Sequence, residues 1–530
     1  MSVQDRGLGS EGSRRSRRDF IRDAAVFGGA LAGTPAVLAA SAAGKVPTAA
    51  TATAKPKLGG ALRVGVSGGG ATDSLDAHKA ATNIDFARIR QLYDLLADRD
   101  HEYNLVPALG TEFIPNSAGD EMTVKLRPGV TFHNGKPLTA EDVVFTFQRI
   151  LNPKVGADEA PLLTPVIAGI KAIDPLTVQF KFKIPFNAFE DFAATLDALI
   201  VPVGYDPTHP IGTGPFKFES FTPGQQSVFT RNKNYWGAGP YVDSVTIIDI
   251  AVDSTRVDAL VSGAVDAIDS VPYALLPSVQ ANGNVEALIS KAGNWYPTTM
   301  RVDRPPFNDV RVRQAFRLIV DRPQMIADAY GGHARLANDL YAPDDPLYAH
   351  LPQREQDIEK AKSLLKQAGR ENLTVNLVTA PIENGVVASS VVFAQQAKAA
   401  GVNVQVTKLD NTTFYNKQYV QRVFSVDWWS TLSFIATTAY AQTSKAPFNE
   451  THYANAQFDK WYFELIGTKK PALQKEIARE MQMQLWTNGG EIIPGFPNNI
   501  DSYSKKVTGF VGDLSGYNLG AWDFKAVWFV

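Results

Sequence analysis

Residues 126–147, LRPGVTFHNGKPLTAEDVVFTF, constrain the fold more than any other stretch of this chain. Arg127-Pro128-Gly129 predicts a turn at the end of a strand, and Asn134-Gly135 predicts a second tight turn, because both residues tolerate positive φ. Thr139 and Asp142 have the spacing of a capping box, and acids in the first turn of a helix suit its dipole. Apolar residues then recur on one helical face. The stretch therefore predicts a strand, two turns and an amphipathic helix.

Three further segments follow in order along the chain. Residues 211–236 are IGTGPFKFESFTPGQQSVFTRNKNYW, residues 306–332 are PFNDVRVRQAFRLIVDRPQMIADAYGG, and residues 359–369 are EKAKSLLKQAG. Together with residues 126–147, they closely resemble the signature segments of the family-five solute-binding proteins of ABC transporters, which carry peptides, nickel, opines or oligosaccharides. The resemblance covers roughly residues 58–530, and four matches in the same order make it specific.

The resemblance implies an α/β fold with two lobes, the periplasmic-binding-protein fold of type II, cluster C, with an extra domain inserted in the first lobe. Combined with the pattern of apolar runs, it predicts the domain boundaries. We expect the first lobe at 58–85 and 207–292, the inserted domain at 86–206, the second lobe at 293–489, and a return to the first lobe at 490–530.

The resemblance also implies a function outside the cytoplasm. The chain would capture a peptide or peptide-like small solute between its lobes and deliver it to the permease and ATPase subunits of an ABC importer. An opine, an oligosaccharide or a nickel complex stays open as the ligand. Capture requires no chemical step, so we expect neither an enzyme nor a cofactor, and we expect a monomer.

The composition limits the other classes. The 530 residues include 52 basic and 54 acidic side chains, which gives no basic surplus for binding nucleic acid. The chain has no cysteine, which excludes disulfides, thiolate catalysis and thiolate metal sites. The same absence excludes the lipidated cysteine that tethers some members of this family, so we expect no lipid anchor.

The N-terminal residues 1–43 have the pattern of an export signal. Residues 16–22, SRRDFIR, resemble the twin-arginine motif, residues 24–40 form a modestly apolar core, and Ala40-Ser41-Ala42 suits cleavage. The glycines in that core make it too weakly apolar for a membrane anchor. Removing its six basic and four acidic residues leaves 46 and 50 in the mature chain. We therefore predict a periplasmic protein, with residues 44–57 as a flexible linker.

Residues 373–407 form the clearest βαβ pattern. We expect a strand at 373–378, an Ala-rich helix at 385–400 with Gly401 at its C-terminal cap, and a strand at 402–407. Elsewhere the periodicity predicts helices at 84–97 and 470–486 and a strand at 177–182.

The peptide Gly65-Val66-Ser67-Gly68-Gly69 has the G-x-S-x-G pattern of a nucleophile elbow and follows a predicted strand. An elbow needs a helix directly after the serine to complete the oxyanion hole, and here the glycines predict a loop. An exported hydrolase that uses Ser67 is therefore the disfavoured alternative. The resemblance instead places this loop at the mouth of a cleft, with Ser67, Gly68 and the pair Leu75-Asp76 near a ligand.

Metal and nucleotide sites have little support. The seven histidines are dispersed, with no pair at helical ligand spacing and no H-E-x-x-H. No Walker lysine or GxGxxG stands at a strand–helix junction. We expect no metal site, although distant histidines could still assemble one for nickel.

Paired aromatic residues are the best candidates for binding. Trp295-Tyr296 lies where the family's chain crosses between lobes, and Trp428-Trp429 lies near the region that supplies its ligand-contacting strand. Such rings suit a pocket that desolvates an amphipathic solute, although packing in the core explains each of them equally well. Weaker candidates are Phe434, Tyr440 and Tyr453.

One departure from the family concerns the ligand. Its peptide carriers often place an aspartate shortly after the tryptophan strand, where it pairs with the ligand's α-amino group. Residues 430–445 contain no acid here, and a buried ammonium without a carboxylate partner is costly. The protein therefore either uses Asp427 for this purpose or binds something other than a plain N-terminal peptide.

Overall fold

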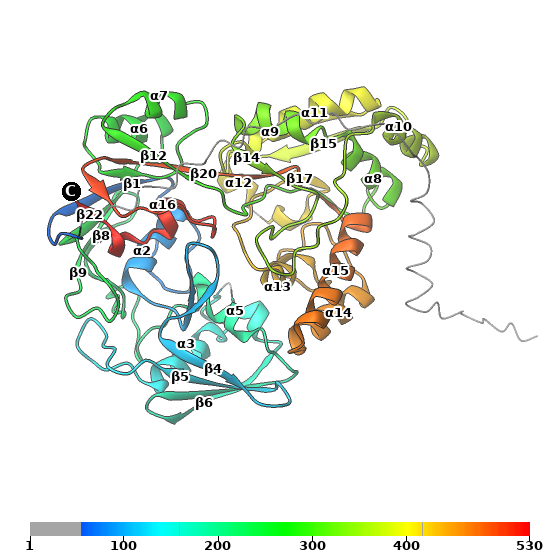
Figure 1. Cartoon of the computed structure of the whole chain (residues 1–530). Helices are drawn as coiled ribbons and strands as arrows, with labels where there is room; N and C mark the ends of the chain where they lie inside the picture. Colours follow the sequence, from blue (N-terminus) through cyan, green and yellow to red (C-terminus); the bar gives the residue numbers. More distant parts are fainter. Residues whose placement is uncertain (1–54, 158, 416) are drawn as a thin grey trace, which may run out of the picture. The chain divides into compact units, whose positions relative to one another are not determined.

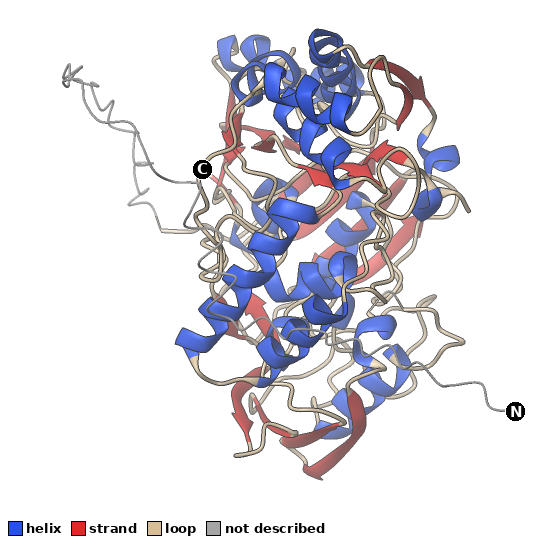
Figure 2. Ribbon diagram, turned by 90° about the vertical axis from the view of Figure 1, so that its right-hand side faces the viewer, coloured by secondary structure: helices blue, strands red, loops and turns tan. Residues whose placement is uncertain are grey.

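The computed structural model describes residues 55–157, 159–415 and 417–530. The predicted signal peptide and most of the predicted linker lie outside the described residues. The fold combines β-sheets with helices that pack against them (Figures 1 and 2). Among the described helices, none has both the length and the apolar character needed to cross a bilayer.

A mixed seven-stranded sheet forms what we call the first lobe. In spatial order, its strands are β12 (Val285–Ser290), β20 (Asn499–Ser504), β11 (Ala267–Ile268), β1 (Ala61–Val66), β10 (Ser244–Asp249), β9 (Gln226–Arg231) and β8 (Phe216–Thr222). β1 is parallel to both β10 and β11, whereas the outer pairs are antiparallel. The sheet therefore joins three separate stretches of chain.

Short helices and ribbons complete the first lobe. The helices are α2 (Asn83–Leu92), α6 (Asp253–Val261), α7 (Leu276–Ala281), α16 (Asn518–Ala521) and the 3-10 turn η5 (Phe524–Ala526). Two-stranded ribbons pair β2 (Ala97–Arg99) with β3 (Leu105–Pro107), and β21 (Val507–Thr508) with β22 (Trp528–Phe529).

The helix predicted at 84–97 is shorter than expected. α2 begins after Thr82, whose side chain accepts from the Asp85 amide, and it ends at Leu92 because Tyr93 is extended. The Leu92 carbonyl instead accepts from the Gly214 amide at 2.9 Å. A Cβ at Gly214 would lie 2.5 Å from the Leu92 backbone, so the Gly-Thr-Gly-Pro segment lets two backbones meet. The boundary predicted at residue 86 falls inside this helix.

An antiparallel sheet of four strands forms a separate layer, the four-stranded domain. Its strands are β4 (Gly110–Pro115), β5 (Glu121–Leu126), β7 (Thr177–Phe182) and β6 (Ile167–Asp174), in that order, and its helices are α3 (Ala140–Ile150), α4 (Ala160–Leu163), α5 (Phe189–Ala193) and η1 (Leu196–Ala198). α3 follows Thr139 as predicted. The Asp142 carboxylate accepts from both the amide and the hydroxyl of Thr139, at 3.0 and 2.9 Å.

The second lobe is built on a five-stranded sheet. Its order is β16 (Asn403–Lys408), β15 (Thr374–Thr379), β17 (Phe424–Val426), β13 (Thr298–Met300) and β18 (Glu491–Ile492). β15 and β16 are parallel around α11 (Val386–Ala397), which confirms the predicted βαβ unit. Gly401 closes the following turn η2 (Lys398–Ala400) at φ 77°.

Further helices surround this sheet. They are α8 (Val310–Ile319), α9 (Arg322–Tyr330), α10 (Ile358–Gln367), α12 (Asn411–Phe414), η3 (Tyr419–Gln421), α13 (Phe434–Thr437), the π-turn η4 (Thr438–Gln442), α14 (Ala456–Gly467) and α15 (Pro471–Asn488). α9 and α11 pack together beside β15 (Figure 1), and β14 (Ala334–Leu336) pairs with β19 (Gly495–Pro497).

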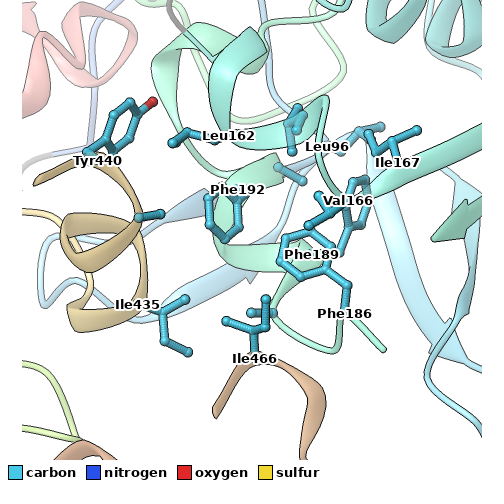
Figure 3. Packing of buried hydrophobic residues seen from close by; sticks show 14 of the residues in the cluster. Leu96, Leu162, Val166, Ile167, Phe186, Phe189, Phe192, Ile435, Tyr440 and Ile466 are labelled. Carbon is cyan, nitrogen blue, oxygen red and sulfur yellow. The ribbon is translucent and has the colours of Figure 1, made fainter. Parts of the chain in front are cut away.

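The four-stranded domain and the second lobe share an apolar cluster. Phe189 and Phe192 of α5 belong to the same buried cluster as Ile435 of α13 and Ile466 of α14 (Figure 3). Separate clusters lie against the seven-stranded sheet and the five-stranded sheet. The regions that line the site described next are therefore each backed by buried apolar packing.

Candidate functional site

A cavity of about 1440 Å³ opens between the two lobes. The first lobe lines it with the loop after β1 and the start of α2, the four-stranded domain adds residues 195–197, and the second lobe adds segments beginning at residues 381, 408 and 428. Small-molecule sites usually measure about 300–1,000 Å³, so this one leaves room for an extended solute with water.

On the first-lobe side, the loop after β1 is held by a buried ion pair. The amide and the hydroxyl of Ser67 both donate to Asp269, each at 2.7 Å. Asp269 is fully buried, and its carboxylate lies 3.2 Å from Nε of Arg256. Burial raises the pKa of Asp269, although Arg256 opposes the shift. The Ser67 hydroxyl is thus an anchored donor.

On the second-lobe side, five rings form a continuous surface that we call the aromatic wall: Tyr415, Tyr419, Trp429, Tyr440 and Phe448. Neighbouring ring centroids lie 5.1–6.4 Å apart, with Phe448 in contact with three of the other rings. Edge and tilted contacts at these distances are favourable for aromatic rings.

The polar ends of the wall are bonded behind it, away from the cavity. Tyr415 donates its hydroxyl to Asp427 at 2.8 Å, and Tyr419 also hydrogen-bonds Asp427. Trp429 Nε1 donates to Glu450 at 3.3 Å, and the hydroxyl of Tyr440 donates to Glu159. The wall therefore offers the cavity mainly ring carbon.

Asp427 and Glu450 form a buried carboxyl pair behind the wall. Burial raises the pKa of Asp427, against the hydrogen bonds from Tyr419, Trp428 and Tyr415. Burial and the neighbouring Asp427 raise the pKa of Glu450 well above its ordinary value. Burial and the neighbouring acid thus favour the protonated form of Glu450 beside Asp427.

A third carboxyl lies directly on the cavity and bridges the lobes. Oε1 of Glu383, in the second lobe, accepts from Asn83 Nδ2 of the first lobe at 3.2 Å. The neighbouring Asn384 also reaches the first lobe, at the carbonyl of Val271. Burial and the nearby Asp269 raise the pKa of Glu383 to about 7.

Of the residues predicted to bind ligand, five line this cavity: Ser67, Gly68, Trp428, Trp429 and the weaker candidate Tyr440. Trp295 and Phe434 do not. They belong to a stack of rings that runs from Phe434 through Tyr341 and Trp295 to Trp429, with centroids 5.4–5.6 Å apart. Only Trp429, at the end of the stack, reaches the cavity.

The other predicted residues also lie away from the lining. Tyr296 is 4% exposed and packs edge-on against Tyr330 in the core of the second lobe. Asp427 is fully buried behind Tyr415. Asp76, which was expected near a ligand, pairs with Arg149 at 2.7 Å.

The sequence reasoning missed Tyr415, Tyr419, Phe448, Asn83 and Glu383, all of which line the cavity. Tyr415 and Tyr419 are four residues apart, a spacing that suggests a shared face. Asn83 and Glu383 are 300 positions apart, and nothing in either local sequence links them.

The histidines have structural partners. His133 donates from Nε2 to the Gly214 carbonyl at 3.0 Å and accepts from the Gly212 amide at 3.2 Å. His78 is fully buried, and burial lowers its pKa to about 4. In the part of the chain that the structure describes, no three His, Cys, Asp or Glu side chains are grouped to hold a metal ion.

Comparisons with known proteins place the chain among solute-binding proteins. The family model described as bacterial extracellular solute-binding proteins, family 5 Middle, matches residues 104–448. The glutathione-binding protein GsiB of Escherichia coli O1:K1 / APEC is 27% identical over 477 residues, which cover 85% of this chain and 92% of that protein.

Two solved structures have the same fold. The periplasmic binding protein DppA from Helicobacter pylori, in complex with the peptide STSA, has a TM-score of 0.79 at 20% identity, covering 89% of this chain and 98% of that one. The binding protein AgaA from A. tumefaciens R10, in complex with agropinic acid, has a TM-score of 0.79 at 22% identity, covering 89% and 99%.

Proposed function

Because the chain belongs to family 5 of the bacterial extracellular solute-binding proteins, we propose that it captures a peptide or peptide-like small solute in the cavity between its lobes and delivers it to an ABC permease. The fold is the predicted two-lobed α/β fold of the type II periplasmic binding proteins. The observation that carries the proposal is a cavity of about 1440 Å³ lined from both lobes and faced by the aromatic wall.

The geometry suggests how capture works. A solute between the lobes contacts both of them, so its binding energy favours the closed arrangement over an open one. Asn83 and Glu383 already meet across the cavity, and Asn384 reaches Val271 beside them. These contacts complete the closed form that the membrane subunits recognise, and the ATPase belongs to those subunits.

Our proposal includes no covalent chemistry. Ser67, the candidate nucleophile, donates its hydroxyl to Asp269, and Asp269 is paired with Arg256. A serine activated for attack needs a base that accepts its proton and passes it on, commonly a histidine. The lining of the cavity, within the described residues, includes no histidine.

We also propose an export route, a location and an oligomeric state for the protein. Export by the twin-arginine route fits residues 16–22, and a soluble periplasmic form without a lipid anchor fits the lack of cysteine. A monomer that binds neither nucleic acid nor a cofactor suffices, because one chain supplies the whole lining of the cavity.

The first experiment identifies the solute. Protein purified from its native host is denatured, and the released small molecules are identified by mass spectrometry. Each candidate is then titrated into ligand-free protein by calorimetry, and small-angle scattering measures the radius of gyration with and without it. Saturable binding by one solute class together with a smaller radius supports the proposal. Substrate turnover, with scattering unchanged by every solute, contradicts it.

A pair of variants tests whether the aromatic wall binds that solute. Phe448→Ala removes a ring in the wall, whereas Phe463→Ala makes the same change at a ring that is 50% exposed on α14. We expect Phe448→Ala to weaken binding about tenfold, and Phe463→Ala to leave it unchanged. Equal affinities for both variants would place the solute elsewhere.

A further inference from the structure

In the described part of the chain, two positively charged side chains line the cavity: Arg256 already has hydrogen-bond partners, and Lys408 lies at the exposed edge. The charged residues in the lining are Asp197, Asp253, Arg256, Glu383 and Lys408. Arg256 is 99% buried in its side chain and donates to the carboxylate of Asp253 and to three backbone carbonyls at 2.8–3.0 Å. Lys408 is exposed at the end of β16. Among the described residues, neither cation forms an ion pair with Glu383, because Arg256 pairs with Asp253 and Asp269 and no acid partner is found for Lys408.

Glu383 lines the cavity on the second-lobe side. It is half-buried, and its Oε1 accepts only the neutral amide of Asn83 among the side chains that the structure describes. It forms no ion pair with any described residue, although the nearby Arg256 opposes the rise in its pKa. A buried carboxylate without a cation gains most from a partner that brings a positive charge.

The aromatic wall has the matching property. The faces of tyrosine and tryptophan rings attract cations within about 6 Å. Tyr415 donates its hydroxyl to Asp427 and Trp429 donates its Nε1 to Glu450, which pushes electron density into both rings and strengthens that attraction. The acid pair behind the wall adds negative potential from the same side; among the described residues neither acid forms an ion pair, and Arg422 offsets only part of this potential from farther away.

We infer that the cavity selects an organic cation, an amine or guanidinium with an apolar body, whose positive group lies against Glu383 and whose body lies on the aromatic wall. This inference rests on the proposed function and narrows it to one class of solute. Solutes with net negative charge are disfavoured, because Glu383 and the acid pair behind the wall repel a carboxylate, and the cation that lines the second-lobe side, Lys408, lies exposed at the end of β16.

The experiment compares forms of one tripeptide that differ in the charge at their two ends. The tripeptide Ala-Leu-Ala is titrated by calorimetry in four forms: the amide with a free amino terminus, the free acid, the N-acetyl amide and the N-acetyl acid. These forms are cationic, zwitterionic, neutral and anionic, with the same side chains. We expect the cationic amide to bind about tenfold or more tightly than the neutral form, and the anionic form to bind most weakly.

The variant Glu383→Gln tests the anchor. Glutamine keeps the acceptor for Asn83 and the shape of the side chain, so folding should be preserved. In this variant the cationic and neutral forms should bind within about threefold of each other, while the neutral form keeps its wild-type affinity. Glu371→Gln makes the same chemical change in an exposed loop of the second lobe and should retain the full preference for the cation.

Two results would overturn the inference while leaving the proposed function intact. One is a neutral or anionic form that binds as tightly as the cation. The other is a preference for the cation that survives in Glu383→Gln. If the tripeptide does not bind, the same comparison is made with the amide and acyl derivatives of the solute that co-purifies. If no solute binds at all, the proposed function fails, and the inference fails with it.

Discussion

Two buried aspartates in the second lobe are held in opposite ways. Asp339 is fully buried and accepts from Arg322 at 2.7 and 2.8 Å and from Arg354 at 2.7 Å. Asp427 is equally buried, but its donors are the hydroxyl of Tyr415, the amide of Trp428 and the hydroxyl of Tyr419. The side-chain donors to Asp339 are charged guanidinium groups, whereas the direct donors to Asp427 are neutral.

The consequence is a difference in pKa. Burial alone would raise the pKa of Asp339, but the guanidinium groups of Arg322 and Arg354 outweigh it, and the pKa lies below its ordinary value. Burial raises the pKa of Asp427, and the neutral donors do not reverse the shift. Asp339 is therefore held in a fixed ion pair, whereas Asp427 lies behind the aromatic wall with neutral hydrogen-bond donors.

The largest effect is expected at the charge-matched site. Asp339→Asn leaves Arg322 and Arg354 buried without their counter-ion, so the free energy of unfolding should fall by about 3–5 kcal/mol. Residue 339 has φ 58°, a conformation that asparagine adopts readily, so the change isolates the charge. Urea unfolding monitored by tryptophan fluorescence measures it.

The control is the exposed pair of Asp309 and Arg311. Asp309→Asn keeps a side chain that can cap α8 and removes an ion pair in water, so the stability should hardly change. If Asp339→Asn also left the stability unchanged, the buried guanidinium groups would not depend on Asp339, and the contrast with Asp427 would disappear.

Turns and helix caps could be predicted from the sequence, whereas contacts between residues far apart in the chain could not. The segment 126–147 folds as predicted because each of its signals is short: Gly129 and Gly135 take φ 79° and 85°, and α3 begins after Thr139. α2 stops at Leu92, five residues before its predicted end. The helix ends there because the amide of Gly214, more than a hundred residues later, donates a hydrogen bond to the Leu92 carbonyl.

The same limit applies to the cavity. Trp295, Phe434 and Trp429 are all aromatic candidates in the sequence, but they lie in one stack of rings, and of these three only Trp429 lines the cavity. Which ring is last depends on how β13 pairs with β17. Glu383 and Asn83 meet only because the two lobes come together, and no spacing within either segment encodes that contact.

The carboxyl pair should make stability depend on pH. Burial and the neighbouring Asp427 raise the pKa of Glu450, so the folded chain keeps a proton that the unfolded chain releases near 4.5. Wild-type stability therefore falls as the pH rises above 4.5, by up to about 1.4 kcal/mol per pH unit. Glu450→Gln has no proton to release at this position. The free energy of unfolding of the variant should therefore rise relative to that of the wild type as the pH increases.

Urea unfolding at a series of pH values from 4 to 8 measures that difference. Glutamine keeps an acceptor for Trp429 and gains a donor for Asp427, so the variant should fold. A difference between variant and wild type that stays constant over this range would mean that Glu450 does not hold the extra proton, and the second-lobe acids would then differ less than proposed.

The smallest effect is expected at one neutral donor of Asp427. Tyr415→Phe removes the 2.8 Å hydrogen bond to the carboxylate and keeps the ring in the wall. The free energy of unfolding should fall by about 1 kcal/mol at pH 8, and by less at pH 4, because a hydroxyl bonds a carboxylate more strongly than a protonated acid.

Tyr103→Phe is the matched control for this prediction. The hydroxyl of Tyr103 donates at 2.9 Å to the carbonyl of Thr431, an acceptor that carries no charge at any pH. Losing this hydrogen bond should therefore lower the free energy of unfolding by the same amount at pH 4 and pH 8. The decrease caused by Tyr415→Phe should differ between the two pH values. If both variants lost the same stability at both pH values, Asp427 would not change its charge in this range. The proposed contrast between Asp427 and the ion-paired Asp339 would then lose its support.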